Sequence, residues 1–196
     1  MIQYKKYYMP GTKEELLKTI DTIDCTYDIL AGGTDLYAKE KTPFNGADAA
    51  IDISGIKEFS VIELKKDEGL ITFGSNICIQ QFLEEKVLME NVPILRHAAI
   101  YFADQQIREM ATVGGNVANS SPSGDTIAPL TVLEAVIHTI TSKDNKICEK
   151  ETPITEFITG VGKNLLEKGE VISSITCPVL KEYGCAFKKV GLRRSL

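Results

Sequence analysis

Two glycine pairs are the residues of this chain whose type and setting point most directly to chemistry. They stand in Ala31-Gly32-Gly33-Thr34-Asp35 and in Thr112-Val113-Gly114-Gly115-Asn116. Each follows an apolar stretch, 28–31 or, less cleanly, 107–113, where a strand is expected to run into a turn. Glycine lets main-chain N–H groups approach an anion closely. Together the pairs predict two main-chain cradles for one large anionic ligand.

Both glycine pairs also have a simpler interpretation, because Gly-Gly after a strand often only makes a tight turn. The first is neither a dinucleotide G-x-G-x-x-G nor a P-loop, since no Lys-Ser/Thr follows it. A run of amides and hydroxyls, 116–125, follows the second and ends in Asp125. Such a run needs polar partners if it is buried. From the residues alone, Asp125 either N-caps the next helix or accepts hydrogen bonds from ribose hydroxyls.

Composition excludes several classes of protein. The 196 residues are 43% hydrophobic and carry a net charge of -5, which disfavours nucleic acid as a partner. No apolar run approaches the roughly 20 residues that span a bilayer, and the N-terminus lacks a signal-peptide core, so we expect a cytoplasmic protein. The five cysteines are scattered and include no C-x-x-C pair. The two histidines lie far along the sequence from one another and from most of the cysteines. We therefore expect reduced thiols and no metal or iron–sulfur centre in this chain.

Hydrophobic periodicity predicts a small α/β lobe followed by mostly antiparallel strands with helices. A capping box at Thr12-x-x-Glu15 opens the first helix, and Phe102 is expected to end the helix that Pro93 opens. The expected strands are 28–31, 49–53, 60–64, 70–73, 134–141, 146–150, 171–176 and 185–190, with further helical segments at 78–88, 126–133 and 153–158.

Two motifs in order resemble a known family: Ala-Gly-Gly-Thr-Asp-Leu (31–36) and Gln-Ile-Arg-x-x-Ala-Thr-Val-Gly-Gly-Asn-Val-Ala-Asn-x-Ser-Pro-x-x-Asp (106–125). They are similar to the FAD-binding subunit of molybdenum hydroxylases, the xanthine, carbon monoxide and nicotinate dehydrogenase type. The likeness runs from Tyr7-x-x-Pro10 to the segment 185–191, nearly the whole chain. It implies an α+β, two-lobed FAD-binding fold of the vanillyl-alcohol-oxidase/PCMH type.

By this resemblance, 1–55 is the N-terminal α/β lobe, 56–180 the second lobe, and 181–196 the start of a truncated C-terminal domain. Either the sequence is then a fragment or a truncated form, or a neighbouring chain supplies the missing part. The flavin face and acceptor site that this part helps to enclose depend on it.

The resemblance also implies which residues bind FAD. The first loop would hold the pyrophosphate by N–H groups and the Thr34 hydroxyl. The Asp35 carboxylate should avoid the diphosphate and act through its main chain or as a cap, because like charges repel. Phe102 would lie near the isoalloxazine ring, Asp125 would bind ribose or ribityl hydroxyls, and Ile172 would contact FAD through its backbone. The implied set is Ile29, Leu30, Ala31, Gly32, Gly33, Thr34, Asp35, Phe102, Thr112, Gly114, Gly115, Asn116, Asp125, Ile172 and Lys188.

Two of these residues have a plain structural alternative. A Phe at helical spacing, as at position 102, is usually a core residue. Lys188 suits an anionic flavin or phosphate by its charge, but it can equally be an exposed strand lysine.

The implied function is electron transfer without substrate chemistry in this chain. A molybdopterin-binding large subunit would oxidise the substrate, and a [2Fe-2S] small subunit would pass the electrons to FAD. FAD would then reduce NAD+, NADP+ or another acceptor. Two alternatives stay open: a self-contained FAD oxidoreductase of the related two-lobed type, and a flavin-free docking module.

Overall fold

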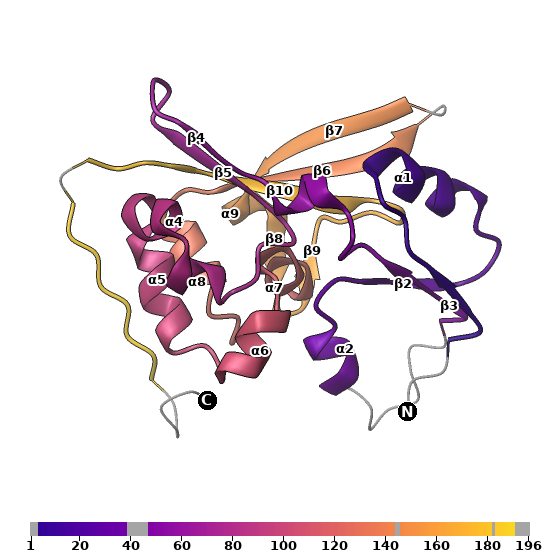
Figure 1. Cartoon of the computed structure of the whole chain (residues 1–196), viewed down its shortest axis with the longest axis horizontal. Coiled ribbons are helices and arrows are strands. Elements are labelled where there is room, and N and C mark those ends of the chain that lie inside the picture. Colours follow the sequence, from indigo (N-terminus) through magenta and orange to yellow (C-terminus); the bar gives the residue numbers. More distant parts are fainter. Residues whose placement is uncertain (1–3, 39–46, 144–145, 182, 191–196) are drawn as a thin grey trace.

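The computed structural model describes residues 4–38, 47–143, 146–181 and 183–190 (Figure 1). The chain has an α+β fold with two main sheets. A three-stranded parallel sheet lies within residues 6–52, and a five-stranded antiparallel sheet lies within residues 62–178. The expected α+β fold class is confirmed. The expected domain boundaries stay predictions, and 191–196 lie outside the described residues.

The small lobe is a parallel sheet with one long helix. Strands β1 (Lys6–Tyr8), β2 (Tyr27–Leu30) and β3 (Ala49–Asp52) pair in the order β1-β3-β2. Helix α1 (Lys13–Thr22) begins as the capping box predicts, because the Glu15 N–H donates to the Thr12 hydroxyl at 3.2 Å. The Glu15 carboxylate reaches back one residue further than expected, to the Gly11 N–H at 2.7 Å. A short helix, α2 (Thr34–Ala38), follows the first glycine pair.

The large lobe is an antiparallel sheet covered by helices on one face. Its strands pair in the order β4-β5-β10-β6-β7, so the last strand lies at the centre. Figure 1 shows α4 to α8 gathered on the same side of this sheet. The bounds are η1 (Lys57–Ser60), β4 (Ile62–Lys65), β5 (Leu70–Gly74), α3 (Gln81–Glu84), α4 (Lys86–Asn91), α5 (Pro93–Ile100), α6 (Gln105–Met110), α7 (Val113–Asn119), α8 (Ile127–Val132), β6 (Val136–Lys143), β7 (Lys146–Pro153), α9 (Ile154–Phe157), β8 (Ile158–Gly160), β9 (Lys163–Asn164) and β10 (Val171–Pro178).

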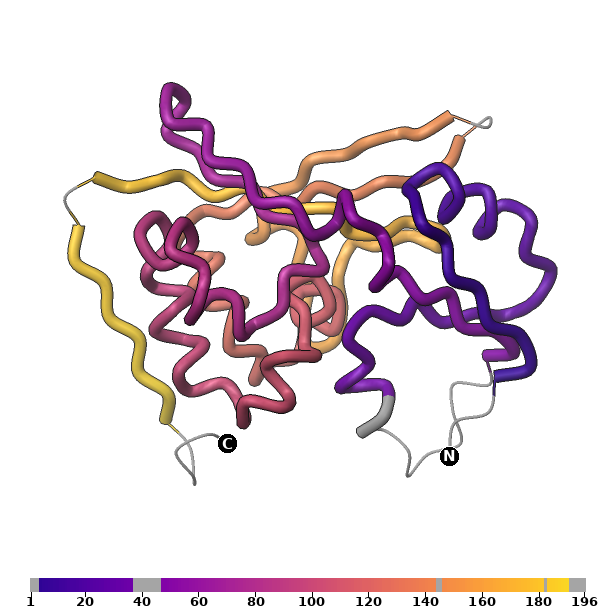
Figure 2. Tube along the Cα trace, viewed as in Figure 1, coloured from indigo at the N-terminus to yellow at the C-terminus, as the bar shows by residue number. Residues whose placement is uncertain are grey.

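A shared apolar cluster joins the two lobes. Ile140 of β6 and Val171 of β10 are buried with Leu16 of α1 and Ile51 of β3. Fully burying an aliphatic side chain of this kind contributes about 1.5–3 kcal/mol. The cluster therefore fixes the small lobe against one end of the large sheet, as the trace in Figure 2 shows.

The structure differs from the sequence-based elements in several places. Residues 107–113 form no strand: α6 covers their first part, and the second glycine pair lies inside α7. The segment 78–88 holds two short helices, not one. Residues 185–190 are not a strand among the described residues. The short strands β1, β8 and β9 were not predicted, because two or three residues carry too little periodicity to detect.

No helix within the described ranges is both long enough and apolar enough to cross a bilayer.

Gly74 offers a test of how closely η1 packs against the end of β5. A Cβ on Gly74 would lie 2.0 Å from the carbonyl oxygen of Phe59 in η1. Gly74→Ala should therefore lower the free energy of unfolding by about 2 kcal/mol or more, because the backbone must shift. The matched control is Gly55→Ala, where nothing lies within 4 Å. Urea unfolding of both variants measures the difference, and equal stabilities would contradict the close approach.

Candidate functional site

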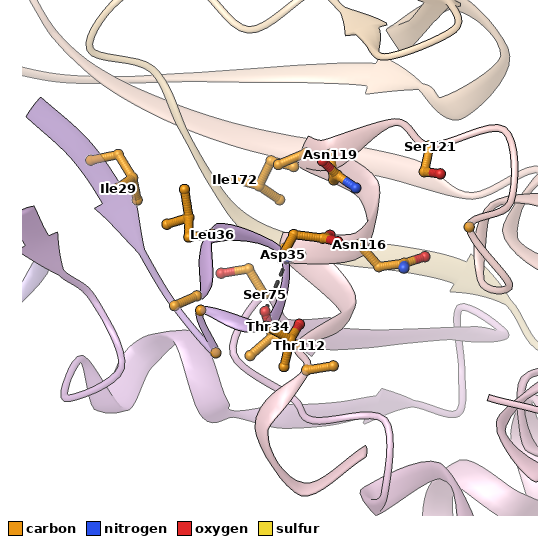
Figure 3. A pocket seen from close by; sticks show the side chains of 18 of the residues that line it. Ile29, Thr34, Asp35, Leu36, Ser75, Thr112, Asn116, Asn119, Ser121 and Ile172 are labelled. Carbon is orange, nitrogen blue, oxygen red and sulfur yellow. Dashed lines mark hydrogen bonds between the residues drawn. The ribbon is translucent and has the colours of Figure 1, made fainter. Parts of the chain in front are cut away.

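A single large pocket brings the two glycine loops together. Its volume is about 630 Å³, within the usual range for a cofactor or other small-molecule ligand. Its walls come from the first loop, from the end of β5, from α7 and from the start of β10. Figure 3 shows Thr34, Ser75 and Thr112 close together, with Ile29 and Leu36 to one side and Ser121 to the other.

The first glycine pair is required by the fold as well as placed for a ligand. Gly33 has φ +70°, a left-handed conformation that other L residues adopt at a cost. A Cβ on Gly32 would lie 1.8 Å from the carbonyl oxygen of Met110 at the end of α6. Only glycine at position 32 therefore allows the first loop to contact the chain just ahead of the second loop.

The first loop also presents unused hydrogen-bond donors. The first N–H groups of a helix have no partner within that helix, and α2 begins at Thr34. Among the described residues, no main-chain carbonyl accepts from the N–H groups of Gly32 and Gly33. A continuous run of donors thus lies along one wall of the pocket. Asp35 lies in the first turn of α2 with an exposed side chain.

The N–H groups at the second glycine pair already have acceptors within the protein, contrary to the expectation that this pair forms a free cradle. The Thr112 hydroxyl N-caps α7 and accepts from the Gly115 N–H at 3.0 Å. The Gly114 N–H donates to the Ser75 carbonyl, and the Asn116 N–H to the Thr112 carbonyl. A Cβ on Gly114 would lie 2.5 Å from Ser75 Cβ. Here glycine serves packing, and the N–H groups already have acceptors inside the protein.

The polar run after α7 is satisfied in part by itself. The Asn116 side-chain oxygen accepts from the Thr126 hydroxyl at 2.5 Å, and the Ser121 and Ser123 hydroxyls lie 3.0 Å apart. Asp125 does not N-cap α8, whose N-cap residue is Thr126. Its carboxylate accepts from the Lys189 ammonium at 2.8 Å. The N-cap alternative for Asp125 is therefore wrong.

Most of the expected binding residues line this one pocket, and two do not. Leu30 is buried in β2, where its carbonyl accepts from the Ile53 N–H. Lys188 is exposed, and its neighbour Lys189 lines the pocket in its place. The lining members of the expected set are Ile29, Ala31, Gly32, Gly33, Thr34, Asp35, Phe102, Thr112, Gly114, Gly115, Asn116, Asp125 and Ile172.

Phe102 is both a core residue and a residue of the pocket wall. It packs against the main core cluster and also lines the pocket. Arg108 holds it there by donating to the carbonyl oxygens of Phe102 at 3.0 Å and Ala103 at 3.3 Å, and to the Gln80 side chain at 2.9 Å. Ala103 has φ +35°, a strained conformation for a residue with a Cβ. The Arg108 guanidinium thus stabilises a strained turn in the pocket wall.

Two polar atoms in the wall lack partners. Ser75 Oγ and Asn76 Oδ1 are buried, and no protein group among the described residues bonds to them. Both residues line the pocket. Buried polar groups are normally hydrogen-bonded, so these atoms fit a polar ligand better than an apolar one. Together with the donors of the first loop, the wall suits an elongated ligand with an anionic centre and polar ends, as FAD has.

The family comparison agrees with this geometry. Residues 2–180 match the family described as FAD binding domain in molybdopterin dehydrogenase. The chain belongs to this family. FAD is accordingly its cofactor, as the resemblance implied.

Named relatives of this FAD-binding domain are subunits of dehydrogenases. It is 28% identical to the nicotinate dehydrogenase FAD-subunit of Eubacterium barkeri over 97% of this chain and 64% of that protein. The chain is also 27% identical to the glyceraldehyde dehydrogenase medium chain of Sulfolobus acidocaldarius, over 95% of this chain and 64% of that protein. The xanthine dehydrogenase FAD-binding subunit of Escherichia coli O157:H7 is 31% identical, over 86% and 56%. The chain thus spans less than two thirds of these relatives' lengths.

Solved structures show the same fold. The FAD-binding domain superposes on a chain of carbon monoxide dehydrogenase from Hydrogenophaga pseudoflava with a TM-score of 0.90 and 25% identity, covering all of this chain and 67% of that one. A chain of quinoline 2-oxidoreductase from Pseudomonas putida 86 gives the same TM-score at 20% identity, which shows the fold alone. The two-lobed PCMH-type fold is confirmed.

The cysteines of the FAD-binding domain form no cluster with other ligands. Within the described part of the chain, no three His, Cys, Asp or Glu side chains are placed to hold a metal ion. The cysteines are free, and burial raises the pKa of the Cys177 thiol well above its usual range. A protonated, inaccessible thiol of this kind is a core residue.

Sequence reasoning missed the pocket-lining residues Ser75, Asn76 and Lys189. It also missed Arg108, whose side chain donates to the carbonyls of Phe102 and Ala103 in the wall. Ser75 and Asn76 follow β5 without a motif, so only the fold reveals that Ser75 lies against α7 and that both residues line the pocket. Arg108 stood within the recognised motif, but its role depends on α6, which was not predicted. Lys189 directly follows Lys188, the lysine that the resemblance implied.

Arg108 allows a test of the pocket wall. Arg108→Met should cost about 1–3 kcal/mol of stability and weaken FAD binding, because the half-buried carbonyls of Phe102 and Ala103 lose their donor. Arg108→Lys should retain only part of the stability and FAD affinity, since an ammonium cannot reproduce the forked geometry of the guanidinium donors. Arg96→Met, at an exposed position of α5, is the control. Unfolding in urea and FAD titration measure both effects, and equal behaviour of the two Met variants would contradict this role.

Proposed function

We propose that this chain is part of the FAD-binding electron-transfer subunit of a molybdopterin-dependent hydroxylase or dehydrogenase. Electrons pass from [2Fe-2S] clusters of a partner subunit through FAD to NAD+ or another acceptor. A molybdopterin-binding large subunit oxidises the substrate. The relatives' names, medium chain and FAD-subunit, support an assembly of several chains. The cytoplasmic location stays a prediction.

One observation supports the FAD site above all others: both glycine motifs line the same pocket, although about 80 residues of sequence separate them. The wall has a clear polarity. Unused N–H donors lie on the first loop, and the Asp125–Lys189 pair lies on the opposite lobe. A diphosphate is best held by N–H donors that approach it closely, and glycine permits that approach. We therefore assign the pyrophosphate to the first loop and to the Thr34 hydroxyl.

The residues of this chain bind and orient the cofactor. Bound FAD supplies the ability to accept and release electrons, which no protein side chain here provides. Phe102 and Ile172 line the pocket and offer apolar contact to an aromatic ring system. Thr112 and Asn116 hold α7 in place through their hydrogen bonds, so they shape the pocket from the second loop. None of these roles needs a catalytic acid, base or nucleophile.

Gly33 provides a mutational test of the assignment. Asn tolerates a left-handed backbone better than most residues, so Gly33→Asn should cost at most about 1 kcal/mol of stability. Its side chain would stand on the loop that lines the pocket, and FAD affinity should fall about tenfold or more. Gly69→Asn is matched in backbone conformation, with φ +66° in the β4–β5 turn and open space around it. FAD titration of the apoproteins, followed by flavin fluorescence, compares them; equal affinities would contradict the assignment.

The electron-transfer step has its own test. The FAD-loaded chain is mixed with a chemically reduced [2Fe-2S] partner subunit, and the visible absorbance of oxidised flavin is followed. We expect bleaching that depends on the partner and is reversed by the acceptor. Persistently oxidised flavin would contradict electron transfer. Reduction by a small organic substrate without partners would instead support a self-contained oxidoreductase, and failure of the chain to bind FAD would support a docking module.

A further inference from the structure

The segment 183–190, here called the C-terminal strap, lies along α5 on the outside of the large lobe. Figures 1 and 2 show it as the yellow end of the chain beside the helices. Its burial alternates: 183, 185, 187 and 189 are half-buried, and the residues between them are exposed. Alternation of period two is typical of extended chain with one face against a protein surface. The strap therefore turns position 189 inward and position 188 outward.

Three contacts hold the strap in this register. Cys185 Sγ lies 3.7 Å from His97 Nδ1, and the rings of Phe187 and Tyr101 have centroids 6.1 Å apart. The Lys189 ammonium donates to the Tyr101 carbonyl at 3.4 Å. The strap thus delivers one cation to the rim of the pocket.

Lys189 is set in an acidic surrounding. Of the pocket-lining residues in the described ranges, it alone carries a positive charge, while Asp28, Asp35, Asp125 and Glu170 are acidic. The side chains of Lys189 and Asp125 are 17% and 12% exposed. At this burial an unpaired carboxylate is unfavourable, and it would repel an anionic ligand. The 2.8 Å ion pair removes both problems for Asp125.

The pair leaves hydrogen-bonding capacity for a ligand. Asp125 Oδ2 accepts from Lys189, and no protein donor among the described residues reaches Oδ1. An ammonium has three protons, of which Lys189 uses one on Asp125 and one on Tyr101. One acceptor and one donor therefore stand side by side at the pocket wall.

We propose that Lys189 is a further binding and positioning residue, which orients Asp125 and forms with it a donor–acceptor pair for a ligand edge of complementary type. This inference rests on the proposed function and names the subsite of the same cofactor. Both ends of FAD carry such an edge: an amino group beside a ring nitrogen in adenine, and an N–H beside a carbonyl in isoalloxazine. The shared chemistry is a neutral heteroaromatic edge with a donor next to an acceptor.

The test measures binding of FAD, ADP and FMN to the full-length apoprotein by calorimetry. Lys189→Met should weaken FAD binding about 10- to 100-fold, the usual effect of losing hydrogen bonds to charged groups. It should weaken only one of the two halves, ADP or FMN, and the affected half identifies the end of FAD at this pair. Lys189→Arg should restore most of the affinity. The control, Lys181→Met, alters an exposed lysine that does not line the pocket, and this variant should bind all three ligands as the parent chain does.

A double-mutant cycle checks that the two residues act together. Asp125→Asn combined with Lys189→Met should weaken FAD binding by less than the product of the single effects, because residues in contact couple. If both Met variants bind FAD like the parent chain, Lys189 has no such role. If Lys189→Met weakens ADP and FMN alike and lowers stability in urea, its role is structural and the inference is wrong. If the parent chain itself binds no FAD, the proposed function fails first.

Discussion

Close main-chain approaches that only glycine permits hold this site together. Gly32 lies against the Met110 carbonyl, and Gly114 lies against Ser75. The first contact joins the small lobe to the end of α6, and the second joins α7 to the end of the large sheet's β5. Any Cβ at these positions would separate elements that form opposite walls of one pocket. The polar chemistry of the pocket depends on these two contacts, since neither loop alone encloses a ligand.

The two glycine motifs look alike in sequence and act differently in the structure. At the first, Gly33 is left-handed and α2 begins at Thr34, and no main-chain carbonyl in the described part of the chain accepts from the N–H groups of Gly32 and Gly33. At the second, the N–H groups of α7 already donate to Thr112, Ser75 and Ile77. An anion gains little from donors that must first give up an internal partner. We therefore propose that the anionic centre of FAD lies on the first loop, whereas the second glycine pair serves packing.

Sequence reasoning reached the fold class and most of the pocket, and its misses have local causes. Capping boxes, turn residues and long hairpins leave strong patterns, which is why α1 and the β4–β5 hairpin were found. Helix α6 was missed because Asp104, which accepts from the Ile107 N–H as N-cap, precedes a helix of only six residues. Lys189 lines the pocket although the sequence pointed to Lys188, and this difference has another cause. Because the strap pairs with no strand in the described part of the chain, strand pairing does not fix its register. Its contacts with Tyr101, at the end of α5, decide which lysine faces inward.

We propose that one FAD molecule lies between the two loops with its pyrophosphate on the first. A crystal structure of the chain with FAD bound would test this placement. We expect pyrophosphate oxygens at hydrogen-bond distance, about 2.9 Å, from N–H groups between Gly32 and Leu36. We also expect the hydrogen bonds of 113–116 within the protein to persist. A pyrophosphate seated on the N–H groups of Val113 to Asn116, or outside the pocket, would contradict the proposal.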